Sequence, residues 1–476
     1  MSALWTISAM AEAMRAERSG ALSDNVTGIS IDSRTLTPGE AYFAIKGDVH
    51  DGHDFVNAAL DRGASVAVIA KDHRGKFAVD AKLLVVNDVL AALVDLGKAS
   101  RARFGGKVIA VTGSVGKTST KEALLTVLGA QGETHASAAS FNNHWGVPLS
   151  LARCPESATF AVFEIGMNHA GEIEPLVKMV RPHVAIVTTV EPVHLEFFSG
   201  IEAIADAKAE IFSGLESHGA AVLNIDNSQF ARLKKQAEAK GARIVSFGAN
   251  GKADARLIDI SLHPTCSAVH ANILGNDVTY KIAVPGKHIA MNSLAVLAAA
   301  TLAGADLALS ALALAQIKPA AGRGVRETLA VAGGTAALID ESYNANPASM
   351  AAALNVLGQA DVSARGRRIA VLGDMLELGP TGPALHRGLS EAVVVNKIDL
   401  VFCCGPLMQH LWEVLPSAQK GGYAKDSAAL ESQMVQAVGA GDAIMVKGSL
   451  GSRMKLIVTA LQKRFPGKAA LDDAVV

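Results

Sequence analysis

Aromatic side chains and cysteines are both scarce in this chain of 476 residues. Aromatic residues make up only 4% of the sequence, although hydrophobic residues make up 50%. We therefore do not expect a membrane protein with aromatic belts at its interfaces. The four cysteines show no C-x-x-C spacing, and a chain of this length does not need disulfides to fold. Free thiols in a reducing cytosol are expected.

The sequence also lacks a long uninterrupted apolar run. The best candidate, 290–317, contains Asn, Ser, Thr, Asp and Gln, so a pair of buried helices explains it better than a membrane span. No basic run precedes an apolar core at the N-terminus, and no signal peptide is expected. A net charge of -1, with Lys and Arg dispersed, gives no footprint for nucleic acid. These absences favour a cytoplasmic protein that acts on small molecules, and we expect a monomer.

The length exceeds what one hydrophobic core supports, so several domains are expected. Breaks at RARFGG (101–106) and KPAAGRG (318–324) predict boundaries near 104/105 and 318/319. From residue 107 onward, short Val/Ile-rich runs alternate with Ala-rich stretches, which predicts α/β domains with parallel sheets. An alternating pattern at 257–284 predicts a small antiparallel patch, and the tail 469–476 is expected to fray. The clearest predicted strands are 108–112, 160–165, 184–190, 220–225, 244–247, 336–340, 368–372, 400–403 and 443–447.

The strongest single motif is TGSVGKT at 112–118, which follows an apolar run and precedes a helix-forming segment. This is the strand, turn and helix context of a phosphate-binding loop. Backbone N–H groups can close around phosphate oxygens, Lys117 can neutralise the transferred phosphate, and the Thr118 hydroxyl can hold Mg²⁺. Val111 stands where the general motif has its first glycine, so only the shorter variant is present. The alternative is a glycine-rich turn with one exposed lysine.

Two polar residues are expected near this loop. Glu164 interrupts the apolar run 160–163 at a strand end, where a buried carboxylate needs a partner such as a hard cation. The next strand ends in TTVEPVH (188–194). If the two strands are neighbours, His194 lies at the same carboxyl edge of the sheet, where open α/β sheets bind ligands. A hydrogen-bonded loop histidine is the alternative for His194.

Lys208 lies on the apolar face of the helical stretch 201–212, because its neighbours three and four positions away are Ile, Ala and Phe. One explanation is a lysine that snorkels to the helix end. The other is that desolvation lowers the pKa of its amine. A neutral amine can take up CO₂ as a carbamate, which is an anionic oxygen ligand able to orient Mg²⁺.

Taken together, these motifs resemble the Mur ligases, in the same order and at similar separations over nearly the whole chain. The segments that carry the resemblance are TGSVGKT at 112–118, EIGMN at 164–168, HLE at 194–196, AKAEIF at 207–212, GKH at 286–288, MN at 291–292, GR at 322–323 and DESYNANP at 340–347. Glu191 is a departure, because a small residue is usual before the Pro-x-His of the family.

The resemblance implies three α/β domains: a small N-terminal domain that binds a uridine diphosphate, a central P-loop ATPase domain with a mostly parallel sheet, and a C-terminal Rossmann-like domain. It also implies roles for individual residues. ATP contacts are expected from Thr112, Gly113, Ser114, Val115, Gly116, Lys117, Thr118, Asn292, Arg323, Asp340 and Asn344. Lys117, Glu164, His194 and Lys208 are the expected catalytic residues, and Thr118, Glu164, His194 and carbamylated Lys208 the expected Mg²⁺ ligands. Substrate contacts are expected from Ser33, Arg34, Lys46, Gly47, Asn142 and Asn143.

Within the family, FNNHWGVPLSL at 141–151, YNANP at 343–347 and LGDMLELG at 372–379 are similar to members that join D-alanyl-D-alanine to UDP-N-acetylmuramoyl-tripeptide through an acyl phosphate. Members that add meso-diaminopimelate typically carry an Asp-Asn-Pro-Arg motif, which this sequence lacks. Folylpolyglutamate synthetases share the loop and the lysine but usually begin near the ATPase domain, so the segments before residue 104 argue against them. A P-loop ATPase that forms no amide is the alternative outside the ligases.

Overall fold

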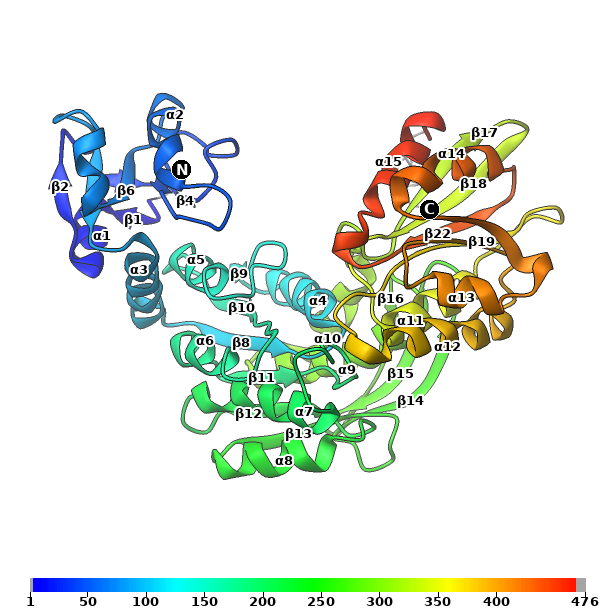
Figure 1. The fold of residues 1–476 in the computed structure, drawn as a ribbon. Coiled ribbons are helices and arrows are strands. Elements are labelled where there is room, and N and C mark those ends of the chain that lie inside the picture. Colours follow the sequence, from blue (N-terminus) through cyan, green and yellow to red (C-terminus); the bar gives the residue numbers. More distant parts are fainter. Residues whose placement is uncertain (1–2, 468–476) are drawn as a thin grey trace, which may run out of the picture.

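The structure is a computed structural model that describes residues 3–467, so the predicted fraying of 469–476 lies outside the described residues. Three α/β domains follow one another along the chain, each built on its own sheet. In Figure 1 the N-terminal domain (blue) and the C-terminal domain (yellow to red) lie on opposite sides of the central domain (cyan to green). None of the helices in residues 3–467 combines the length and apolarity needed to cross a bilayer.

The N-terminal domain has a five-stranded sheet in the order β2-β7-β6-β5-β4, parallel except for the edge strand β2. The strands of this sheet are β2 (Glu17–Ser19), β4 (Ile29–Ser30), β5 (Ala41–Phe43), β6 (Val66–Ala70) and β7 (Leu83–Val86). Two further strands, β1 (Trp5–Thr6) and β3 (Asn25–Val26), pair with each other in a separate two-stranded sheet. The helices of the domain are α1 (Ile7–Met14), η1 (Gly52–Phe55), α2 (Val56–Asp61), η2 (Lys71–Lys76) and α3 (Val89–Arg103). The long helix α3 packs under the sheet and leads into the central domain.

The central domain has a nine-stranded sheet in the order β16-β15-β14-β13-β12-β11-β8-β10-β9. Its strands are β8 (Lys107–Thr112), β9 (Thr134–Ala136), β10 (Phe160–Glu164), β11 (Val184–Val187), β12 (Ala220–Asn224), β13 (Arg243–Gly248), β14 (Ala255–Leu262), β15 (Ser267–Ile273) and β16 (Asn276–Ile282). Its helices are α4 (Lys117–Gly129), α5 (Gly146–Ala152), α6 (Ile173–Val180), α7 (Ile201–Ala209), η3 (Glu210–Gly214), α8 (Phe230–Ala239), α9 (Lys287–Leu302), α10 (Leu307–Ala313) and η4 (Leu314–Gln316).

Seven strands of this sheet, β8 to β14, run parallel, and β15 and β16 form the antiparallel patch predicted at 257–284. Helices cover both faces, so the near-continuous apolar runs of β8 and β10 are buried on each side. The stretch 290–317 forms the two predicted helices; α9 is buried, whereas Leu309 and Leu312 of α10 are exposed. The strand predicted at 184–190 ends earlier, at Val187, because Thr188 turns its hydroxyl onto the carbonyl of Val115 at 2.6 Å.

The C-terminal domain has a six-stranded sheet in the order β17-β18-β22-β19-β20-β21, parallel except for the edge strand β17. Its strands are β17 (Val325–Val331), β18 (Gly334–Glu341), β19 (Arg368–Gly373), β20 (Leu400–Cys404), β21 (Lys420–Ala424) and β22 (Ala443–Lys447). Its helices are α11 (Pro347–Gly358), η5 (Gly379–Thr381), α12 (Gly382–Val395), α13 (Gln409–Val414), η6 (Ser417–Gln419), α14 (Ser427–Ala437), η7 (Leu450–Ser452) and α15 (Lys455–Arg464). Apolar clusters on both faces make it doubly wound.

The chain passes from one sheet to the next near the segments 101–106 and 318–324, where the sequence predicted domain boundaries. Helix α3 ends at Arg103 and β8 begins at Lys107, while η4 ends at Gln316 and β17 begins at Val325. We propose the domain boundaries at 104/105 and 318/319 for this reason.

Candidate active site

The segment 112–118 joins the end of β8 to the start of α4. Gly113 and Gly116 have φ of 145° and 89°, in the region that favours glycine. A Cβ at Gly113 would collide with the Thr188 hydroxyl, and one at Gly116 with the amide of Asn292. The Lys117 amine donates to the carbonyl of Gly113 at 2.8 Å. The chain therefore forms the tight turn at a helix N-terminus that phosphate binding requires.

The carboxylate of Glu164 faces the start of α4. Glu164 is 1% exposed and accepts hydrogen bonds from the Thr118 hydroxyl at 2.8 Å and from the Asn142 amide at 2.7 Å. These contacts follow from the register of β10 beside β8, which aligns Glu164 with Val111. The arrangement gathers hard oxygen atoms at the carboxyl edge of the sheet, as Mg²⁺ prefers.

Lys208 is buried on the inner face of α7, with 2% of its surface exposed. Burial lowers the pKa of its amine well below the ordinary value, and the positive charge of Lys117 adds to this effect. No hydrogen bond or ion pair to its amine is formed within residues 3–467. The predicted burial is therefore confirmed, and the snorkelling alternative is wrong for this lysine.

His194 lies in the loop after β11 and contacts the C-terminal domain. Its Nδ1 lies 2.6 Å from a carboxylate oxygen of Glu377, and the amide of Glu196 donates to the carbonyl of Glu377 at 3.4 Å. Burial lowers the pKa of His194, the Glu377 carboxylate opposes the shift, and the charges of Lys117 and Lys208 reinforce it. His194 thus shares the electrostatic environment of both lysines and joins two domains.

Arg323 comes from the connection to the C-terminal domain and reaches the phosphate loop. Its guanidinium donates to the Ser140 hydroxyl at 3.3 Å and lies 4.2 Å from the ring centre of Tyr343. Burial lowers the pKa of Lys117, Glu164 opposes the shift, and the charge of Arg323 adds to it. Arg323 therefore lies close to the phosphate loop, and its contact with ATP stays a prediction.

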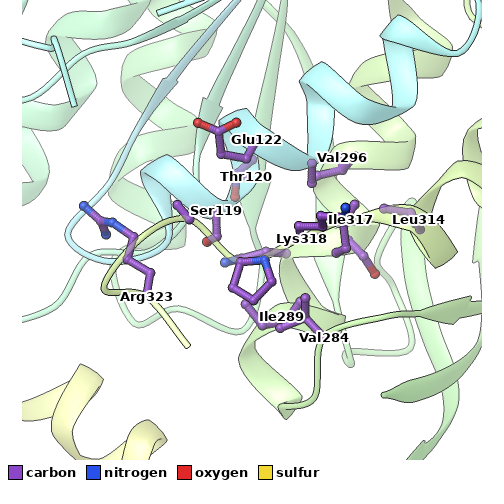
Figure 2. Close-up of a pocket in the computed structure, with 15 residues that line it drawn as sticks. Ser119, Thr120, Glu122, Val284, Ile289, Val296, Leu314, Ile317, Lys318 and Arg323 are labelled. Atoms are coloured by element: carbon purple, nitrogen blue, oxygen red, sulfur yellow. The ribbon is translucent and has the colours of Figure 1, made fainter. Parts of the chain in front are cut away.

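A pocket opens between α4, α9 and the segment 314–323. Figure 2 shows Ser119, Thr120 and Glu122 on α4, with Val296, Ile317 and Lys318 gathered to one side and Arg323 to the other. Asn292 also lines this pocket. Apolar walls with a few polar groups, next to a phosphate loop, suit the base of a nucleotide.

Asp340 and Asn344 lie next to the segment that carries Arg323, but their side chains have partners within the protein. Asp340 is 2% exposed and accepts from the amine of Lys455 at 2.7 Å and the Ser342 hydroxyl at 2.6 Å. The side-chain oxygen of Asn344 accepts from the amide of Ala345 at 2.9 Å. A contact from either residue to a nucleotide stays a prediction.

The residues predicted to hold the uridine diphosphate lie on loops of the N-terminal domain. Arg34 is held by both carboxylate oxygens of Asp32, and Gly47 donates its amide to the carbonyl of His50 at 2.9 Å. Ser33 precedes Arg34, and the backbones of Lys46 and Asp51 form an isolated antiparallel β-bridge. This group is built on a different sheet from the phosphate loop.

Helix α5 and the residue after it contact the N-terminal domain. The indole of Trp5 donates to the carbonyl of Ala152 at 2.8 Å, and Arg153 donates to the carbonyl of Ile29 at 2.8 Å. Asn142 touches Glu164, whereas Asn143 accepts from the amide of Gly146 at the start of α5. The structure therefore brings Asn142 into the phosphate site and gives Asn143 a role in starting the helix.

Comparisons with known proteins bear on the whole chain. Family models match in three consecutive parts: "Mur ligase family, catalytic domain" at 25–101, "Mur ligase middle domain" at 111–300, and "Mur ligase, glutamate ligase domain" at 327–450. A UDP-N-acetylmuramoyl-tripeptide–D-alanyl-D-alanine ligase of Escherichia coli (strain K12) is 33% identical, covering 96% of this chain and 98% of the relative. The chain belongs to the Mur ligase family.

Other relatives agree with this assignment. The ligase of the same name from Rickettsia prowazekii (strain Madrid E) is 31% identical over 96% of this Mur ligase and 100% of the relative. Among solved structures, MurF from Acinetobacter baumannii has a TM-score of 0.82 at 28% identity, covering 96% of this chain and 99% of that one. MurF from Thermotoga maritima, solved in complex with ADP, has a TM-score of 0.75 at 25% identity, covering 92% and 97%. This Mur ligase is thus an ATP-dependent ligase with the three-domain α/β architecture of those structures.

Sequence reasoning missed several residues around the site of this Mur ligase. Ser140 lies 3.4 Å from the Thr118 hydroxyl, and Glu377 reaches His194 across 183 positions of sequence. No local sequence pattern predicts that either of these pairs of side chains comes into contact. Lys121 is 0% exposed, but the helical spacing that singled out Lys208 does not single it out, because its neighbours Lys117 and Thr118 are polar.

Glu191, the departure from the family pattern, has partners of its own. Its carboxylate accepts from the Thr189 hydroxyl at 2.9 Å, and its amide donates to the Ser114 hydroxyl at 2.9 Å. The backbone of Glu191 is therefore bonded to the phosphate loop through Ser114, and its side chain is bonded to Thr189 in the same segment.

Proposed function

We propose that this Mur ligase joins D-alanyl-D-alanine to the terminal carboxylate of UDP-N-acetylmuramoyl-tripeptide, with ATP cleaved to ADP and phosphate, as a step of peptidoglycan precursor synthesis. The observation that carries the proposal is the contact of Thr118 with Glu164 beside Lys117, at the start of α4. The reaction takes place in the cytoplasm, where the four free cysteines stay reduced.

The nucleotide is held by the loop and the pocket together. Backbone N–H groups at 113–118 and the amine of Lys117 bind the β- and γ-phosphates, and the pocket between α4 and α9 takes the base. Asn292 borders the loop at Gly116, so it can contact the nucleotide. Arg323 lines the same pocket and adds a positive charge near Lys117.

Chemistry begins with the tripeptide carboxylate attacking the γ-phosphorus. The new bond joins a carboxylate oxygen to phosphorus, the bond to the bridging oxygen of ADP breaks, and the product is an acyl phosphate. The amine of the dipeptide then attacks the acyl carbon, phosphate leaves with the carboxylate oxygen, and the amine loses a proton. The protein supplies no nucleophile, so its work is to fix geometry and neutralise phosphate charge.

The donor atoms around Glu164 fit Mg²⁺. The hydroxyl of Thr118 and the carboxylate of Glu164 are oxygen donors 2.8 Å apart, and the carboxylate is bound only by neutral groups within residues 3–467. Bound Mg²⁺ would neutralise charge on the transferred phosphoryl group. His194 would join from the neighbouring loop.

Lys208 fits the carbamate hypothesis. Burial lowers the pKa of this amine well below its ordinary value, which favours the neutral form that can react with CO₂. Its nitrogen can attack CO₂, form a C–N bond and release a proton, which leaves a carbamate oxygen facing the site. If so, Lys208→Ala loses activity and small carboxylic acids restore part of it. Undiminished activity of the variant without any added acid would contradict this role.

The proposed substrates are tested by offering ATP and UDP-N-acetylmuramoyl-tripeptide with a panel of amino acids and dipeptides. We expect phosphate release and a new amide only with D-alanyl-D-alanine among the panel. Amide formation with another amino acid or dipeptide of the panel would point to another ligase type, and phosphate release that needs no acceptor would point to a simple ATPase.

A further inference from the structure

A second buried lysine lies one turn beyond the phosphate loop. Lys121 is on the same face of α4 as Lys117 and Thr118, because these residues are three and four positions apart. Its side chain is 0% exposed, which is rare for lysine. The mechanism described above gives it no task.

The Lys121 amine is bound by backbone carbonyls rather than by the site. It donates to the carbonyl of Ser137 at 2.6 Å and to that of Ala139 at 2.8 Å, and it pairs with the carboxylate of Glu122 at 2.6 Å. Ala139 has φ of 45°, a left-handed conformation that residues with a side chain adopt rarely. Lys121 therefore holds a strained turn whose conformation the local sequence alone does not favour.

The turn held in this way carries two side chains into the phosphate site. The Ser140 hydroxyl lies 3.4 Å from that of Thr118 and accepts from Arg323, and the Asn142 amide donates to Glu164 at 2.7 Å. The turn is also tied to β10, since Glu164 donates its amide to the Ser137 hydroxyl at 3.3 Å. Helix α4 therefore acts on Glu164 in two ways. Its Thr118 donates a hydrogen bond to Glu164, and its Lys121 holds the turn whose side chains surround Glu164.

We propose that Lys121 is a positioning residue for phosphoryl transfer, which sets the segment 137–142 so that Ser140 and Asn142 orient Thr118 and Glu164. Supporting groups that orient ligand residues in this way typically change activity about 10- to 100-fold when removed. The expected change in kcat rests on the proposed function.

The first test is Lys121→Met, with Lys234→Met on the exposed face of α8 as a matched control. The expected result is a fall in kcat of about 10- to 100-fold with little change in the KM for ATP, because the pocket for the base is left intact. Asn142→Ala should cause a fall of similar size, and the double variant should be much less impaired than the product of the two changes, because both act through Glu164. Effects that multiply, or a kcat within about two-fold of the parent, would overturn the proposal.

The second test is hydrogen exchange of the free protein, which needs no turnover. In Lys121→Met the amides of Phe141 and Gly166, which bond within or to the turn, should exchange faster, while α8 keeps its protection. Unchanged exchange at 137–142 would contradict the proposal. So would global loss of protection in both Lys121→Met and Lys121→Gln, because Lys121 would then serve general stability. Absence of turnover in the parent enzyme would instead reject the proposed function and leave the exchange result standing.

Discussion

Two lysines near the phosphate loop differ in what surrounds their amines. The amine of Lys117 donates to the carbonyl of Gly113 at 2.8 Å, so it is held where a phosphate oxygen can replace that carbonyl. The amine of Lys208 is buried without a protein partner in the described part of the chain. Lys117 is therefore suited to binding a negatively charged phosphate, and Lys208 to covalent modification.

Lys117→Ala should abolish phosphate release. The variant removes the one side-chain cation that the start of α4 offers to the γ-phosphate, and loss of a transition-state charge partner costs about 100- to 1,000-fold. The measurement is phosphate release with all three substrates, with thermal unfolding to show that the fold is kept. Normal turnover by a folded Lys117→Ala protein would refute the assignment of the loop.

Lys208→Met should stabilise the protein at about pH 7, and the gain should shrink as the pH approaches 10.5, the ordinary pKa of lysine. The pKa of Lys208 is lowered in the native state, so between the two pKa values the unfolded chain binds a proton that the native chain does not. Unfolding is therefore favoured at low pH by this lysine, and native stability rises with pH across that window.

The measurement for Lys208→Met is the urea midpoint at several pH values in buffer free of CO₂, with the exposed Lys234→Met as control. A gain that stays constant from about pH 7 to 10 would show that the pKa of Lys208 is ordinary. Added bicarbonate should stabilise the parent protein and leave Lys208→Met unchanged, because only the parent can form the carbamate.

At the scale of elements, the site depends on how neighbouring strands end. The parallel register sets Glu164 beside Val111 and Val187 beside Thr112, so the loops after β8, β10 and β11 meet at one edge. Thr188 then bonds to the carbonyl of Val115 at 2.6 Å, which closes the phosphate loop against the next strand.

Gly113→Ala should disrupt the packing of the phosphate loop against Thr188 and so reduce activity. Its φ of 145° and the contact of a new Cβ with the Thr188 hydroxyl both require the backbone to shift. We expect kcat/KM to fall by about 100-fold or more, since small misplacements at the chemistry cost that much. Gly129→Ala, at the end of α4 with open space around it, is the control and should be neutral or slightly stabilising. Equal kinetics of the two variants would disprove the role of the turn.

The sequence predicted these elements well where local patterns govern them. Apolar runs marked β8 and β10 because both faces of the sheet are covered, and helical spacing identified the burial of Lys208. It failed where a tertiary contact decides. Thr188 ended a predicted strand early, and the bond of Lys121 to the turn at Ala139 left no local signal.

For the whole molecule, the contact of His194 with Glu377 joins the central and C-terminal domains at 2.6 Å. A nearby contact supports it, since Gly379 packs against the backbone of Glu196. Such a contact could not be predicted from sequence, because 183 positions separate the pair. We expect this contact to favour a closed arrangement, which would exclude water from the proposed acyl phosphate.

Glu377→Ala should therefore weaken closure. Without the carboxylate, the C-terminal domain loses a direct bond to the loop of the central domain, and kcat should fall by roughly 10- to 100-fold. Small-angle scattering with bound ADP should give a larger radius of gyration than the parent. Glu413→Ala, an exposed carboxylate on α13, is the control. An unchanged radius and kcat would mean that this contact does not help to close the domains.

In the proposed reaction, the tripeptide carboxylate accepts the γ-phosphate held by the loop at 112–118. This step is tested most directly with UDP-N-acetylmuramoyl-tripeptide labelled with ¹⁸O in its terminal carboxylate. Turnover with ATP and D-alanyl-D-alanine should release phosphate that carries one labelled oxygen, because the acyl phosphate breaks between carbon and that oxygen. Unlabelled phosphate formed together with the amide product would contradict the account.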